Sequence, residues 1–503
     1  MATTTSPHQA AANEPVDAAT DEQRSDSRPG LDLEAGLSAL LVAVSVAIGA
    51  RVVADNSFLT HLTTGDLMRA RGSVPTTDPY SWTAAGADWT VQSWLASLIY
   101  SVVAELAGGL GIRLLNGVLC GLVMVGLLVL ARRHRASFLA GVAAASVALA
   151  IGATMWTPRP LLFGLVGLTA VLVVALPGTD AAGQPRPAPL PAWSLVPVLW
   201  IWVQTHGSFP LAIVAVGAVV VGAALDDRRV PLRELRVLGW VTGGIALGAI
   251  GPLGLGLLLF PLELVGNGDA LEGVAEWQHL SADRPVEWLF LVLVLATLLA
   301  VARGVERRLA VPAVVFSVAG IWAVRNIGVA AIATVPAVAA GLQALPSSLT
   351  GAERNLGARA LGVVAAGLVA VTVALVGLQG ALDLRSFPRD AVDVMVEQDL
   401  AGGADDRILH RDRVGNFLHY RLGTEARVFV DDRFDFYPLE VLTDHRRLLL
   451  EDDPALIAEI IGRWDPTAIL WESGTAVDRW VAEQADWQVT HRDDDWFVAV
   501  PAG

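Results

Sequence analysis

The sequence predicts a polytopic α-helical membrane protein with a small soluble α/β domain at its C-terminus. Two observations predict this fold class. Of the 503 residues, 54% are hydrophobic and 17% are charged, and the mean hydropathy is +0.53, a composition typical of a membrane protein with a soluble part. Apolar runs of the length that crosses a bilayer, about 20 residues, recur between residues 33 and 380, whereas the rest of the chain is acidic and of mixed pattern.

Eleven apolar runs are the predicted spans: 33–54, 111–131, 137–156, 160–177, 191–205, 209–225, 236–260, 286–302, 309–324, 326–345 and 358–380. A further run, 93–108, is shorter and contains Glu105, so we expect it to lie at the membrane interface or to re-enter. The predicted domains are a disordered cytoplasmic leader (1–30), a transmembrane domain (31–380) whose first extracytoplasmic loop is 55–108, and a soluble extracytoplasmic domain (381–503). The leader is polar and has no basic stretch followed by a cleavage site.

The arginines predict the orientation. The sequence has no lysine, and the Arg-richest loops of the membrane part are 132–135, 226–236, 302–308 and 353–359. These loops all face the cytoplasm if the N-terminus is inside and 93–108 does not cross, as the positive-inside rule favours. The same arrangement places the C-terminal domain outside.

The residue pattern of the C-terminal segment predicts alternating strands and helices. The expected strands are 407–410, 427–430, 468–471, 487–492 and 496–500, and the expected helices are 388–401, 438–450, 454–464 and 476–485. This alternation favours a mainly parallel sheet that ends in an antiparallel hairpin. Residues 381–503 carry 26 acidic side chains against 13 arginines, which argues against a nucleic-acid partner. The single cysteine, Cys120, excludes a disulfide framework.

Polar residues at the ends of the spans and in the loops gather on the outer side of this topology. They are Asp55, His61, Asp78, Arg159, His206, Glu276, Trp277, His279, Arg325 and Asn326. A random arrangement would divide them between the two faces of the membrane. Their one-sided distribution predicts an external site.

Asp55 is the leading candidate for a general base, because a partly desolvated carboxylate at a span end can accept a proton from a hydroxyl. The alternative is that Asp55 caps the helix beginning near Ser57. Asp78 is the second catalytic candidate, although Thr-Asp-Pro is also a common turn opener.

Arg159 and Arg325 are candidates for binding a phosphate or pyrophosphate, for which the guanidinium fork is suited. Their alternatives are interface snorkelling and a structural ion pair. His61 and His206 are expected to contact a ligand through hydrogen bonds, and a turn role is the simpler alternative for His206. Glu276 and Asn326 complete the predicted binding residues.

No tight metal-binding spacing such as HExxH is present. A divalent metal held by Asp55 together with a carboxylate such as Glu276 stays an open alternative. Four tryptophans, Trp82, Trp89, Trp94 and Trp277, could stack on sugars, but an interfacial aromatic belt is favoured for most of them. The run Asp431-Asp432-Arg433 could touch substrate, although a structural salt bridge is favoured.

Several segments resemble the GT-C superfamily of polyprenyl-phosphate-sugar-dependent glycosyltransferases, and more closely a bacterial family of multi-pass membrane proteins with a C-terminal extracytoplasmic domain. They are DNSFLTHLTTGDL (55–67), PTTDPYSWTAAGADW (75–89), QSWLASLIY (92–100), TPRPLLFGL (157–165), WVQTHGSFPLA (202–212), RNIGVAAIATVP (325–336) and VGNFLHYRLGTEARVFVDDRFDFY (414–437). One departure is that Asn56 follows Asp55, where GT-C first loops often carry two adjacent acids.

The resemblance implies an inverting glycosyltransferase of the bacterial plasma membrane. It would move a sugar from a polyprenyl-phosphate donor to an extracytoplasmic acceptor, with Asp55 as the base or metal-ligand position and the lipid phosphate near Arg159 and Arg325. The expected partners are this donor and membrane lipid. Two alternatives stay open: a non-catalytic protein that binds or scaffolds lipid-linked glycans, and a transporter. The transporter is disfavoured because no internal repeat is evident.

Overall fold

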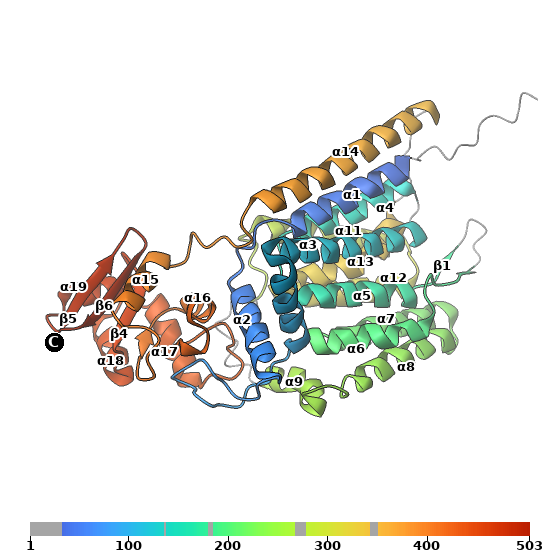
Figure 1. Ribbon diagram of the computed structural model, residues 1–503. Helices are drawn as coiled ribbons and strands as arrows, with labels where there is room; N and C mark the ends of the chain where they lie inside the picture. The colour runs from blue at the N-terminus through green and yellow to red at the C-terminus, as the bar shows by residue number, and fades with distance from the viewer. Residues whose placement is uncertain (1–32, 135–136, 180–184, 267–277, 343–350, 503) are drawn as a thin grey trace, which may run out of the picture.

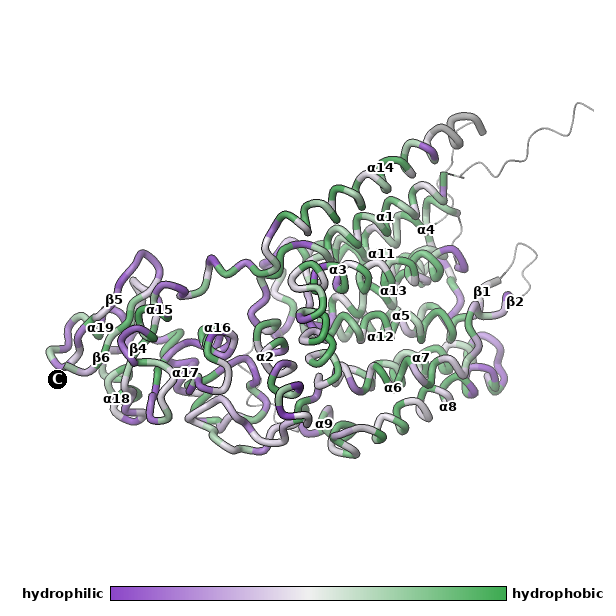
Figure 2. The backbone as a smooth tube through the Cα atoms, viewed as in Figure 1, coloured by the Kyte–Doolittle hydropathy of each residue, from purple (hydrophilic) through white to green (hydrophobic). Residues whose placement is uncertain are grey.

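A computed structural model describes residues 33–134, 137–179, 185–266, 278–342 and 351–502. Figure 1 shows a bundle of long, roughly parallel helices with a smaller, strand-containing part attached at one end. In Figure 2 the bundle is mostly hydrophobic, whereas the attached part mixes hydrophilic and hydrophobic residues. The leader predicted for residues 1–30 lies outside the described residues.

The chain is a polytopic helical membrane protein. Within the described residues, five helical segments are long and apolar enough to cross a membrane: Trp94–His134, Pro210–Asp227, Pro285–Ala302, Val324–Gly341 and Gly357–Leu378. The bundle consists of α1 (Leu33–Gly49), α3 (Trp94–His134), α4 (Phe138–Gly152), α5 (Leu161–Ala175), α6 (Leu195–Thr205), α7 (Pro210–Asp227), α8 (Leu232–Leu247), α9 (Gly254–Gly266), α11 (Pro285–Ala302), α12 (Arg307–Trp322), α13 (Ile327–Gly341) and α14 (Gly351–Leu378). Short connecting elements are β1 (Gly178–Thr179), β2 (Pro185–Arg186), η1 (Ala192–Ser194) and η3 (Val324–Asn326).

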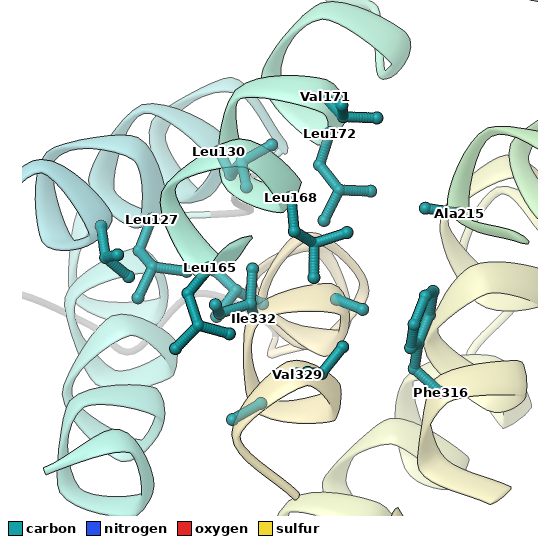
Figure 3. Packing of buried hydrophobic residues seen from close by; sticks show 14 of the residues in the cluster. Leu127, Leu130, Leu165, Leu168, Val171, Leu172, Ala215, Phe316, Val329 and Ile332 are labelled. Atoms are coloured by element: carbon teal, nitrogen blue, oxygen red, sulfur yellow. The ribbon is translucent and has the colours of Figure 1, made fainter. Parts of the chain in front are cut away.

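Helix α13 forms the centre of the bundle. Its segment is 83% buried, compared with 17% for the apolar part of α14. Many α13 residues are glycine or alanine, and small side chains let neighbouring helices approach closely. Figure 3 shows the resulting contacts, in which Val329 and Ile332 of α13 lie near Leu165 and Leu168 of α5. The polar loops at one end of this rigid core can therefore be held in fixed positions.

One predicted span has the wrong bounds. The run 236–260 is divided between α8 and α9, with no α-helix between Leu247 and Gly254. Pro252 has no backbone N–H to donate, and Gly254 adopts a left-handed backbone with φ +58°. Pro252 and Gly254 each disfavour a continuous helix, and apolar composition alone does not overcome this.

A layer of two crosswise helices closes one end of the bundle. Figure 1 shows α2 (Asn56–Arg71) and the first part of α3 across this end. Gly108, with φ 57° and ψ −149°, breaks the helical backbone of α3, so the chain turns there and enters the bundle. Ser101 donates a hydrogen bond to Asp66, and Arg69 pairs with Glu105, so polar contacts join the two crosswise helices.

Replacing Gly65 with alanine is expected to destabilise the protein by about 1–3 kcal/mol through overpacking. A Cβ at Gly65 would lie 2.1 Å from the Ser97 carbonyl oxygen and 2.7 Å from the Ser101 Cβ, so α2 and α3 would have to separate. Thermal unfolding of the purified protein measures this. Gly239→Ala is the matched control, because an added Cβ at this helical glycine meets no atom within 4 Å. Equal melting of the two variants would contradict the predicted close packing.

The C-terminal segment forms a mixed four-stranded sheet in the order β3-β4-β6-β5. Its strands are β3 (Ile408–Leu409), β4 (Ala468–Glu472), β5 (Trp487–Arg492) and β6 (Trp496–Pro501), and its helices are α15 (Arg389–Glu397), α16 (Asp412–Leu422), α17 (Leu439–Leu450), α18 (Pro454–Trp464) and α19 (Ala476–Glu483), with η4 (Gly423–Glu425). The β5–β6 hairpin is antiparallel as predicted, but only β3 and β4 pair in parallel, so the expectation of a mainly parallel sheet is wrong.

The expected strand 427–430 is also wrong as a regular strand. Val428 forms only isolated parallel bridges, one to Ile408 and one to Ser81 of the first loop. Thr83 Oγ1 also donates to the Phe429 carbonyl oxygen at 2.6 Å. Residues 427–430 therefore connect the first loop to the C-terminal sheet, and we call this segment the seam. Helix α16 packs against α2 beside this seam.

Candidate functional site

A cavity of about 1290 Å³ lies where the bundle end, the first loop and the C-terminal segment meet. Its lining includes charged and imidazole side chains from all three parts: Asp55, His61, Arg159, His206, Arg284, Arg325, Arg411, Asp412, Asp432, Arg433, Asp435, His445 and Arg446. Apolar side chains also line it, among them Phe260, Leu264 and Val286. The cavity thus combines positive charge, carboxylates and an apolar surface.

Asp55 lies at the N-terminus of α2 and is held by three donors. Its Oδ1 accepts a hydrogen bond from the Ser57 backbone N–H at 3.1 Å, so it is the N-cap of the helix. Its Oδ2 accepts from Thr157 Oγ1 at 3.0 Å and from Arg159 Nε at 2.6 Å. The Asp55 side chain is 7% exposed and that of Arg159 is 33% exposed. The helix cap and an ion pair therefore coexist at the edge of the cavity.

His61 follows on the same helix and lines the cavity. Its Nδ1 lies 3.0 Å from Ser97 Oγ of α3. Burial lowers the pKa of His61 to about 4, with Asp55 opposing this shift and Arg159 adding to it. The imidazole is consequently neutral at pH 7, and it can donate or accept a hydrogen bond without adding charge.

His206 and Arg325 line the cavity from the bundle side. The Ser208 backbone N–H donates to His206 Nδ1 at 3.1 Å, which fixes the ring in the turn after α6. His206 interacts electrostatically with Arg325 and with His61. Asn326, in contrast, is not among the cavity-lining residues, and its Nδ2 donates to the Ala319 carbonyl oxygen at 3.1 Å. This contact holds the turn between α12 and α13.

Asp78 does not line the cavity. Its carboxylate accepts hydrogen bonds from the Ser81 backbone N–H at 2.8 Å and from Ser81 Oγ at 2.5 Å, which form the turn of the first loop. Its Oδ1 also lies 2.8 Å from Arg433 Nη2. These buried contacts favour a structural role over the catalytic one expected for Asp78.

The residues of the run 431–433 have two different kinds of contact. Asp431 and Arg433 form a buried ion pair, with Arg433 Nη2 2.5 Å from Asp431 Oδ2, as the favoured structural interpretation expected. Asp432, between them, lines the cavity, and Thr60 Oγ1 of α2 donates to its Oδ1 at 3.3 Å. Asp435 lines the cavity as well.

Burial gives these two carboxyl groups unusual acidities. It raises the pKa of Asp432 to about 6, and the charge of Asp431 adds to the rise. It raises the pKa of Asp435 to about 7. Among the sequence-based predictions, Asp432 appears only as part of the run 431–433, for which a structural role is favoured, and Asp435 does not appear, because the sequence does not show that this loop folds back onto α2. The dense run DDRFD (431–435) is the one signal that could have indicated them.

Three arginines that line the cavity, Arg284, Arg411 and Arg446, are also not predicted from the sequence. Arg284 pairs with Glu287 at 2.6 Å, and Arg411 pairs with Glu472, so each has an anionic partner. Arg446 lies on α17. Arg284 and Arg411 precede ordinary helices and Arg446 lies within one, and these sequence contexts do not distinguish a cavity residue from a surface one.

The tryptophans have mostly structural contacts. Trp89 lines the cavity, and the Arg433 guanidinium lies 4.4 Å from the centre of its ring. Trp94 Nε1 donates to Gln204 at 2.8 Å, and Trp82 packs against Phe429. The predicted site residues Glu276 and Trp277 lie outside the described residues. Among the described residues, no group of three or more His, Cys, Asp or Glu side chains could hold a metal ion.

Comparison with known proteins gives a fold relationship. No protein-family model and no curated protein matches the sequence. The archaeal oligosaccharyltransferase AglB from Archaeoglobus fulgidus, solved with an inhibitory peptide and a dolichol-phosphate, aligns with a TM-score of 0.52 and 11% identity over 87% of this chain and 69% of AglB. ArnT from Cupriavidus metallidurans, solved with undecaprenyl phosphate, aligns with a TM-score of 0.47 and 14% identity over 92% of this chain and 97% of ArnT.

AglB and ArnT are GT-C glycosyltransferases. The similarity to AglB confirms the resemblance noted in the sequence: this chain has a GT-C-type fold. Fold alone does not define chemistry, since one fold can carry several functions. The chemistry depends on the residues of the cavity.

Proposed function

We propose that this protein is a membrane glycosyltransferase that moves a sugar from a polyprenyl-phosphate donor to an acceptor outside the membrane. The observation that carries the proposal is the composition of the cavity, where arginines and carboxylates meet an apolar wall. A polyprenyl-phosphate sugar has the same three parts: an anionic phosphate, a polar sugar and a hydrocarbon chain. AglB, which has a similar fold, was solved with a dolichol-phosphate.

Arginines from the bundle side suit the phosphate. Arg159 and Arg325 border the cavity together with Arg284. Guanidinium groups bind phosphate oxygens through paired charge-assisted hydrogen bonds. Phe260, Leu264 and Val286 provide the adjoining surface for the first isoprene units. In this arrangement the arginines stabilise the negative charge that grows on the phosphate as it leaves.

The reaction is a single displacement at the anomeric carbon. The acceptor hydroxyl oxygen forms the new bond to this carbon while the bond to the phosphate oxygen breaks. The electron pair of the broken bond leaves with the polyprenyl phosphate, and a carboxylate of the cavity takes the hydroxyl proton. One displacement inverts the configuration of the sugar.

The proposed topology has eleven spans, the N-terminus in the cytoplasm and the C-terminal domain (381–503) outside a bacterial plasma membrane. In this topology 93–108 stays at the outer interface. Two observations support it. The break at Gly108 ends the crosswise part of α3 before the bundle, and the Arg-rich ends of α3 and α12 lie at the bundle end away from the cavity, as the positive-inside rule favours.

Turnover by the purified full-length protein tests the proposal. The protein in lipid nanodiscs is mixed with a panel of synthetic undecaprenyl-phosphate-linked hexoses and pentoses, with and without extracted cell-envelope glycan as acceptor. Release of undecaprenyl phosphate is followed by mass spectrometry. We expect at least one donor to be consumed. If the protein bound donors tightly but consumed none of them, this result would contradict the proposed enzymatic activity and favour a scaffold.

One observation favours the scaffold as a second candidate. The Asp55 carboxylate already accepts hydrogen bonds from Ser57, Thr157 and Arg159. These three hydrogen bonds occupy most of the lone pairs of the carboxylate and leave few for a substrate hydroxyl. If Asp55 were the only carboxylate at the reacting centre, the cavity would bind a lipid-linked sugar without turning it over.

A further inference from the structure

The loop that follows the seam of the C-terminal segment presents a second carboxylate beside Asp55. Asp432 is half-buried and lines the same cavity. Thr60, five residues after Asp55, donates to Asp432 Oδ1 at 3.3 Å, and Asp432 interacts with Ser57 and Arg159. Both acids therefore interact with Ser57 and with Arg159. They flank the N-terminus of α2.

The backbone of this loop is fixed on both sides of Asp432. Its own N–H donates to Asn416 Oδ1 at 3.2 Å, and Asn416 is on α16, which packs against α2. Asp431 and Arg433 are buried in their mutual ion pair. Because both neighbours are anchored, the Asp432 side chain is directed by the fold rather than by a flexible loop.

The two carboxylates differ in their partners. Asp55 accepts three hydrogen bonds, one of them from a guanidinium at 2.6 Å. Asp432 accepts a side-chain hydrogen bond from Thr60 Oγ1, which at 3.3 Å is long, and a second one from Ser57. Asp432 thus keeps lone pairs available for a hydroxyl in the cavity, whereas Asp55 is committed to holding Arg159.

We propose that Asp432 accepts the proton of the acceptor hydroxyl and that Asp55 is a positioning residue that orients Arg159 toward the donor phosphate. The inference rests on the proposed glycosyl transfer and names its base. The hydroxyl O–H bond breaks as the bond from oxygen to the anomeric carbon forms, its proton passes to the Asp432 carboxylate, and the bond between the anomeric carbon and the phosphate oxygen breaks. Polyprenyl phosphate leaves with the electron pair of that bond.

The charges around Asp432 support this role. Asp431 and Asp412 oppose ionisation of its carboxyl group, whereas Arg159 and a hydrogen bond from Ser57 favour it. Asp435, His61 and Arg433 line the same cavity. With burial as the largest cause, the pKa of Asp432 is about 6. A base must be deprotonated to act, so turnover should fall as the pH drops below about 6.

The test measures turnover against pH for full-length variants with whichever donor of the undecaprenyl-phosphate-sugar panel the wild type consumes. Asp432→Asn should lower kcat by about 10²- to 10⁴-fold, the usual contribution of a general base, leave undecaprenyl phosphate binding unchanged and remove the fall near pH 6. Asp432→Glu should recover part of kcat and keep the fall. Asp55→Asn should weaken undecaprenyl phosphate binding and keep the fall. Asp494→Asn, an exposed acid of the same segment, should behave as the wild type.

Two outcomes overturn the inference while the proposed function stands. One is normal turnover by Asp432→Asn, and the other is loss of the acidic fall in Asp55→Asn but not in Asp432→Asn. Melting temperatures equal to that of the wild type ensure that a loss reflects chemistry and not folding. Failure of the wild type to consume any donor overturns the proposed function itself, and the inference with it.

Discussion

Replacing Arg433 with alanine is expected to lower the free energy of unfolding by about 3–5 kcal/mol, because it leaves buried carboxylates without their partner. Arg433 Nη2 lies 2.5 Å from Asp431 Oδ2 and 2.8 Å from Asp78 Oδ1. Both acids are fully buried at their side chains, and Arg433 is 7% exposed. The guanidinium also lies 4.4 Å from the ring centre of Trp89, a cation–π contact that the alanine variant loses.

The contacts of Arg433 with Asp78 and Asp431 join the first loop to the C-terminal segment. Both parts contribute to the cavity lining, so loss of these contacts should also make this side of the cavity less rigid. Thermal unfolding and limited proteolysis of the purified protein measure the effect. Arg479→Ala is the matched control, since the Arg479–Asp452 pair is exposed and such pairs contribute little. Melting of Arg433→Ala at the temperature of the control would contradict the assignment of this ion pair as the joint between the two parts.

Replacing Arg159 with alanine is expected to weaken binding of undecaprenyl phosphate by about ten- to a hundredfold. Hydrogen bonds to charged groups contribute about 1.5–3 kcal/mol, and each 1.4 kcal/mol corresponds to a factor of ten in affinity. Arg159 is one-third exposed toward the cavity and is held at 2.6 Å from Asp55. Its removal also takes the Arg159 partner away from the Asp55 carboxylate, so turnover should fall as well.

Binding of undecaprenyl phosphate to the protein in detergent, compared with the uncharged alcohol undecaprenol, separates the headgroup from the chain. The preference of the variant for the phosphate should fall about ten- to a hundredfold, and its affinity for undecaprenol should stay unchanged. Arg69→Ala is the control, because Arg69 pairs with Glu105 and does not line the cavity. Equal phosphate preference in wild type and Arg159→Ala would contradict the assigned headgroup site.

The fold could be predicted largely from local patterns. Apolar runs and helix-ending residues indicate most bundle helices, and alternating residues indicate the β5–β6 hairpin, which begins at the predicted residue 487. The division of 236–260 shows the limit, because Pro252 and Gly254 interrupt a run that is apolar throughout. Likewise, 427–430 has strand-like residues, but its pairing depends on a first loop more than 300 residues away in the chain.

Part of the candidate site could be predicted because its residues lie at span ends. The cavity brings together Asp55, His61, Arg159, His206 and Arg325, which the sequence predicts as outward-facing. Asp432 could not be chosen in this way. Its position depends on the packing of α16 against α2, and no periodicity along the chain encodes that contact.

A structure of the full-length protein in nanodiscs, determined with undecaprenyl phosphate, tests the central claim most directly. We predict that the lipid phosphate lies in the cavity against Arg159 and Arg325, with Asp55 and Asp432 on the side where the sugar would be attached. Phosphate bound elsewhere on the bundle, with the cavity empty at a saturating lipid concentration, would contradict the proposed donor site.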